Sequence, residues 1–93
     1  MDDLHRIALH YGYSSQSHIL IEEMAELTKA IIKKQRARTL RDHLQAYENI
    51  IEEIADVEIC LEQIKYLMDL YEKVSEVKES KIKRQLERME KYE

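Results

Sequence analysis

Two short stretches of the sequence repeat one pattern, Ile21–Leu27 (IEEMAEL) and Ile51–Val57 (IEEIADV). The second, third and sixth positions of each stretch are acidic, namely Glu22, Glu23 and Glu26, and then Glu52, Glu53 and Asp56. A helix turns by about 100° per residue, so the three acids of each stretch share one side and border an apolar stripe. The pattern predicts two helices, each with a carboxylate edge beside a face that packs against other residues.

The composition predicts a single all-α domain over residues 1–93. The chain has 37% charged residues, one glycine and no proline, and no stretch shows the alternation typical of a strand. A net charge of −4 argues against nucleic acid as a partner. A lone Cys60, with no secretory leader pattern and no apolar run of bilayer length, predicts a cytoplasmic protein without membrane contact.

Local signals divide the chain into a small bundle of three or four helices. Gly12 marks a break because glycine tolerates a positive φ, and Thr39 followed by Asp42 resembles a capping box at the start of a helix. We expect helices over Asp2–His10, from Ser14 or Ser15 to about Arg38, from Thr39 to near Tyr71, and over Val77–Tyr92. The third of these carries apolar residues at alternating steps of four and three, which predicts a buried stripe of Ile50, Ile54, Val57, Leu61, Ile64 and Met68.

A short turn near residues 39–40 would bring the two acidic stretches together. In an antiparallel pair, residues equally far from the turn face each other, so Glu23 would face Asp56 and Glu26 would face Glu53. Four unpaired carboxylates at close quarters cost several kcal/mol, and a hard cation such as Mg²⁺ or Mn²⁺ relieves this repulsion. The pattern therefore predicts a divalent cation site on an antiparallel helix pair, with solvated surface acids as the alternative.

The residues around the acids favour magnesium over iron or zinc. The third residue after Glu26 is Lys29 and the third after Asp56 is Ile59, so neither acid belongs to the Glu-x-x-His motif of di-iron bundles. A magnesium site built from carboxylates usually shares its ions with substrate phosphates. This chemistry indicates a phosphoanhydride substrate.

The acidic pattern resembles the signature of a known enzyme family. Glu22-Glu23-x-x-Glu26 followed by Glu53-x-x-Asp56 is similar to the EExxE…ExxD motif of the MazG-like all-α nucleoside triphosphate pyrophosphohydrolases. The resemblance extends over residues 11–88. It implies magnesium-dependent cleavage of an NTP or dNTP between the α and β phosphates, giving the monophosphate and pyrophosphate. It also implies homodimers or homotetramers with active sites near the subunit contacts.

The resemblance assigns roles to individual residues. The metal ligands would be Glu23, Glu26, Glu53 and Asp56. Glu22 would hold or deprotonate the attacking water, and Glu53 would be a catalytic residue as well as a ligand.

Substrate contacts are expected from two further segments. Gln16 lies just upstream of the first acidic stretch. Lys81-x-x-x-Gln85-x-x-Arg88 is similar to the family's K-x-x-x-N-x-x-R stretch, with Gln85 in place of asparagine. On a helix these residues and Arg84 fall within an arc of about 100°, so the face can neutralise triphosphate charge.

Two other interpretations remain open at this stage. One is a non-enzymatic helical oligomerisation or adaptor module, and the other is an inactive relative that binds only nucleotide or metal. A hydrophobic content of 44% in so short a chain favours self-association in each case.

Overall fold

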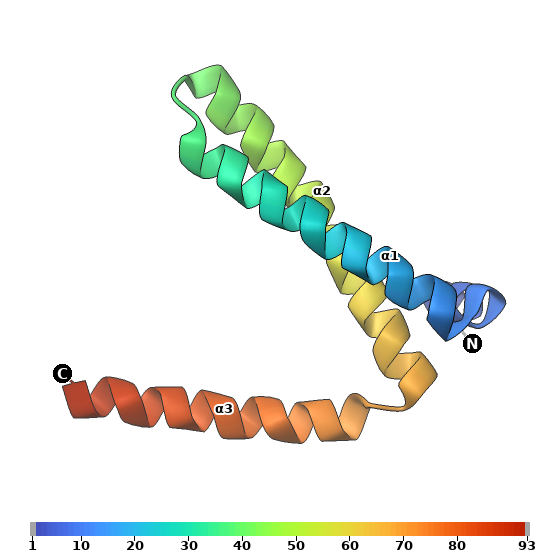
Figure 1. Ribbon diagram of the computed structural model, residues 1–93. Helices are drawn as coiled ribbons and strands as arrows, with labels where there is room; N and C mark the ends of the chain where they lie inside the picture. The colour runs from blue at the N-terminus through green and yellow to red at the C-terminus, as the bar shows by residue number, and fades with distance from the viewer. Residues whose placement is uncertain (1, 93) are drawn as a thin grey trace.

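The chain folds into three helices and no strand within residues 2–92, which the computed structural model describes (Figure 1). Helix α1 spans Asp3–Arg36, α2 spans Leu40–Met68 and α3 spans Tyr71–Tyr92. The all-α class predicted from the composition is confirmed. None of these three helices combines the length and apolar character that crossing a bilayer requires.

Gly12 kinks α1 where the sequence predicts a break between two helices. Its φ of 85° and ψ of 170° are not helical, yet the helix continues on both sides. The helix begins after Asp2, whose carboxylate accepts a hydrogen bond of 2.9 Å from the backbone N–H of His5. The predicted gap between a first and a second helix is thus reduced to one residue.

A three-residue turn joins α1 to α2 near the predicted position. The hydroxyl oxygen of Thr39 accepts a hydrogen bond of 3.1 Å from the backbone N–H of Asp42, as a helix cap does. Helix α2 ends before Asp69, which adopts a left-handed conformation with a φ of 55°. Because Asp69 supplies this turn, α3 begins at Tyr71, ahead of the predicted start at Val77.

Helices α1 and α2 run antiparallel and side by side as a hairpin. Helix α3 starts at the open end of the hairpin and runs at an angle to it (Figure 1). The radius of gyration is 17.0 Å, against about 12 Å for a compact domain of this length. At the first turn of α3, the Tyr71 hydroxyl donates to a carboxylate oxygen of Glu62 and lies 3.0 Å from Nε2 of His5. In place of the bundle of three or four helices that the sequence predicts, the structure has a two-helix hairpin with a third helix attached at one end.

The hairpin interface is formed largely by small side chains. Its buried apolar residues are Ala8, Ala30, Ala46, Val57 and Cys60. Most of the apolar stripe predicted for burial on α2 remains accessible, with Ile54, Leu61 and Met68 42%, 43% and 48% exposed. A single chain thus leaves much of its apolar surface uncovered.

Replacing Gly12 with alanine is expected to destabilise the fold by about 1–3 kcal/mol, because a φ of 85° is strained for any L side chain. No heavy atom lies within 4 Å of the added methyl group, so the loss would reflect the backbone alone. Urea denaturation followed by circular dichroism measures it. Ser14→Ala, at an exposed helical position, is the control, and equal stability of the two variants would contradict the need for a positive φ.

Candidate metal centre

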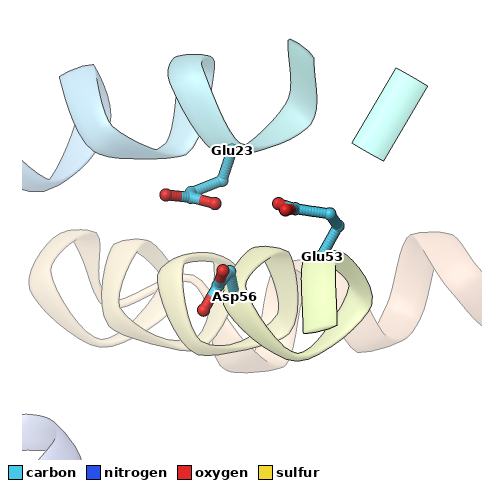
Figure 2. Close-up of side chains that lie close together, drawn as sticks. All are labelled: Glu23, Glu53 and Asp56. Atoms are coloured by element: carbon cyan, nitrogen blue, oxygen red, sulfur yellow. The ribbon is translucent and has the colours of Figure 1, made fainter. Parts of the chain in front are cut away.

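Three acidic side chains meet between the middle of α1 and the middle of α2. Glu23 comes from α1, and Glu53 and Asp56 come from successive turns of α2. Figure 2 shows the carboxylates of Glu23 and Glu53 in the space between the helices, with Asp56 beside them. One carboxylate oxygen of each residue lies within 4.8 Å of the others, which is close enough for all three to bind one ion.

A pair of buried glutamines fixes the register that brings these acids together. The side-chain amide nitrogen of Gln16 donates to the amide oxygen of Gln63 at 2.6 Å, and both residues are less than 5% exposed. Gln16 lies seven residues before Glu23, and Gln63 lies seven residues after Asp56. Seven residues are about two helical turns, so both pairs belong to one continuous antiparallel alignment.

The cluster concentrates negative charge in a partly enclosed space. Burial, and then the negative charges of Asp56 and Glu53, raise the pKa of Glu23 above its ordinary value of 4.5. Oε2 of Glu53 is shielded from solvent and has no hydrogen-bond partner. Among the described residues, no ion pair joins a lysine or arginine to any of the three acids. A divalent cation would supply the missing charge and the missing partner.

The other two acidic residues that the sequence assigns to the site are near these three carboxylates but do not join them. Glu26 is exposed and forms an ion pair of 3.8 Å with Lys29, one turn further along α1. Glu22 precedes Glu23 and is also exposed. Of the four predicted ligands, the structure therefore brings Glu23, Glu53 and Asp56 together, with Glu26 turned toward solvent.

The predicted substrate-binding residues are separated from the acids within one chain. All four residues of the predicted face on α3 are exposed, and α3 diverges from the hairpin (Figure 1). These residues are Lys81, Arg84, Gln85 and Arg88. Gln16 is buried in the hairpin interface, where it has a structural partner in Gln63.

The acidic pattern predicts no role for Gln63, and a cysteine without a base partner is expected to pack in the interior. Cys60 is indeed buried, and its burial and the charges of Glu23 and Asp56 raise its pKa, so the group remains a thiol at neutral pH. Gln63 donates to the backbone carbonyl of Leu4 at 3.2 Å as well as accepting from Gln16. Gln63 follows Asp56 by the same seven residues by which Gln16 precedes Glu23, and this equal spacing is the sequence signal that points to the pairing of the two glutamines.

Comparison of the chain with known protein families, characterised proteins and solved structures gives no match. The geometry of the acid cluster is therefore the basis for a functional assignment.

We expect the metal-free protein to become more stable as the pH falls from 7 toward 5, through the contribution of Glu23. A carboxyl group with a raised pKa in the folded state binds more protons when folded than when unfolded. Keeping Glu23 charged therefore destabilises the folded protein at neutral pH, and this cost disappears on acidification. Urea midpoints of wild type and Glu23→Gln in EDTA would measure this contribution. The variant should be the more stable protein at pH 7 and should lose that advantage at low pH.

The matched control is Glu48→Gln, at an exposed position of the same helix as Glu53. A difference between wild type and Glu23→Gln that stays constant with pH would contradict the electrostatic account of the cluster.

Proposed function

We propose that this protein is a magnesium-dependent nucleoside triphosphate pyrophosphohydrolase of the MazG-like kind. It would cleave NTPs or dNTPs between the α and β phosphates. The observation that carries the proposal is the convergence of Glu23, Glu53 and Asp56 from two separate halves of the acidic pattern. The proposal is further supported by Oε2 of Glu53, which is buried without a hydrogen-bond partner and would gain one from a cation.

The donor atoms fit magnesium or manganese. All three side chains offer hard carboxylate oxygens, and one oxygen of Glu53 is buried without a partner. The Glu26–Lys29 pair joins two largely exposed side chains and is weak, so Glu26 can rotate toward the cluster as a fourth ligand. When bound, the cation would polarise the phosphate oxygens and offset the charge of the leaving pyrophosphate.

The protein's own residues would position water and substrate. Glu22 is exposed next to Glu23 and would hold the attacking water or accept its proton. The cationic groups of Lys81, Arg84 and Arg88 would bind the phosphate chain, with the Gln85 amide donating a further hydrogen bond. Gln16 would act indirectly, because its amide nitrogen is bonded to Gln63.

Self-association would complete the site. Helix α3 has seven basic and five acidic residues, whereas residues 2–70 have eight basic and thirteen acidic residues. Its apolar side chains Ile82, Leu86 and Met89 are 54–56% exposed, and the exposed residues of the α2 stripe are 42–48% exposed. Packing of a second copy against these surfaces would bury them and bring the basic face of α3 to the acids of its partner.

The direct test of the activity is release of pyrophosphate and monophosphate from a panel of NTPs and dNTPs, with Mg²⁺ or with EDTA. We expect metal-dependent pyrophosphate release, reduced about 100-fold or more in Glu53→Gln because a ligand is lost. Glu48→Gln is the control. Inorganic phosphate as the product would show another cleavage position, and no turnover with any substrate would favour the adaptor interpretation.

Complementation between two inactive variants tests the shared site. Glu53→Gln lacks an acid and Arg88→Gln lacks a basic contact, so each alone should be nearly inactive. If α3 of one protomer serves the acids of the other, random mixing in a dimer should restore about one quarter of the wild-type activity. The mixture would be refolded together and assayed for pyrophosphate release. Activity no higher than that of the separate variants would contradict a site built from two protomers.

A further inference from the structure

The tip of the hairpin carries a second concentration of charge, opposite in sign to the acid cluster. Six of the eight basic residues in the segment 2–70 lie between positions 29 and 41. Five of them form the tip cluster, which consists of Lys33, Lys34, Arg36, Arg38 and Arg41. The adjacent Asp42 is the one acidic residue between positions 33 and 43, so this segment has a net charge of +4.

Two residues of the tip cluster line a cavity of about 330 Å³ between the end of α1 and the start of α2. Lys33 and Arg36 line it from α1, and Asp42, Gln45 and Asn49 line it from α2. The cavity thus combines two cationic groups with one carboxylate and two side-chain amides, and the amide nitrogen of Gln45 donates to Oδ1 of Asn49 at 3.2 Å. Such a set of donors suits a ligand rich in oxyanions.

The cations of the tip cluster are largely uncommitted. Among the described residues, no ion pair involves Lys33, Arg36, Arg38 or Arg41. Lys34 differs, because its ammonium group lies 2.9 Å from Nδ1 of His43. This contact joins the end of α1 to the first turns of α2. The two cations that line the cavity, Lys33 and Arg36, therefore have no ion pair among the described residues that would compete with a ligand.

The first turn of α2 adds to the positive potential. The free backbone N–H groups at the start of a helix carry a partial positive charge, and α2 is 29 residues long. Asp42 occupies this first turn, where a carboxylate is stabilised by the helix dipole and offsets only part of the surrounding charge. The tip remains a site that favours anions.

We propose that the tip cavity binds the phosphate oxyanions of a small polyphosphate, without a divalent cation. Its volume is at the lower end of the range of small-molecule pockets, about 300–1,000 Å³. None of the residues that line the cavity is aromatic, so the cavity lacks the stacking surface used to bind single-stranded nucleic acid. A short phosphate chain matches both the size and the charge.

The site is distinct from the acid cluster and does not depend on the proposed activity. Asn49 precedes Glu53 by one turn of α2, or about 6 Å along the helix axis. The two sites are neighbours on one hairpin, and they differ in chemistry because one requires a cation and the other supplies positive charge itself.

Isothermal titration calorimetry with inorganic tripolyphosphate in EDTA tests the proposal on the full chain. We expect binding by wild type and a loss of affinity of about tenfold or more in Lys33→Gln/Arg36→Gln, because two charge-assisted contacts are removed. The control is Lys73→Gln/Lys83→Gln, which removes the same charge from exposed positions of α3. Circular dichroism and thermal melting would establish that each variant is folded.

Two further titrations locate the site and identify the recognised group. Glu53→Gln should bind tripolyphosphate as wild type does. A nucleoside triphosphate in EDTA should bind wild type with an affinity similar to that of tripolyphosphate, because the cavity contacts only its phosphates. The proposal is overturned if wild type does not bind, or if the control double variant loses as much affinity as the tip variant. It is also overturned if binding requires Mg²⁺, or if a single-stranded oligonucleotide binds more tightly than tripolyphosphate.

Discussion

The antiparallel register of α1 against α2 is the constraint on which the rest of the structure depends. The turn after Arg36 sets the approximate alignment, and the buried bond between Gln16 and Gln63 fixes it. A slip of one residue would rotate the acids of one helix by about 100° relative to the other. It would also leave two buried amides without partners, which costs about 1–3 kcal/mol for each unpaired group. One polar contact thus secures the position of a charge cluster two turns away.

Small buried residues in the hairpin interface help to bring the acids of the two helices together. Alanines at positions 30 and 46 let the helix backbones approach closely, so the carboxylates of Glu23, Glu53 and Asp56 meet at short range. Burial, and then the repulsion that comes with close approach, raise the pKa of Glu23. If the cluster binds a cation as proposed, these three carboxylates would need little movement to do so.

Much of this arrangement follows from the sequence, and the exceptions have physical causes. The all-α class, the turn near residue 39 and the meeting of Glu23 with Asp56 follow from periodicity and helix caps, which are local signals. Helix α3 begins earlier than the sequence predicts because Asp69 adopts a left-handed conformation usually reserved for glycine. The exposure of Glu26 and the divergence of α3 depend on tertiary contacts, such as the link between Tyr71, Glu62 and His5, that no local pattern encodes.

We propose that the two acidic stretches are halves of one cation site. The most direct measurement is anomalous X-ray diffraction from crystals grown with Mn²⁺, which locates the ion without reference to any activity. The account predicts a manganese peak bounded by carboxylate oxygens of Glu23, Glu53 and Asp56, with Glu26 turned inward. An ordered hairpin with these carboxylates directed to solvent, and no peak between them, would contradict it.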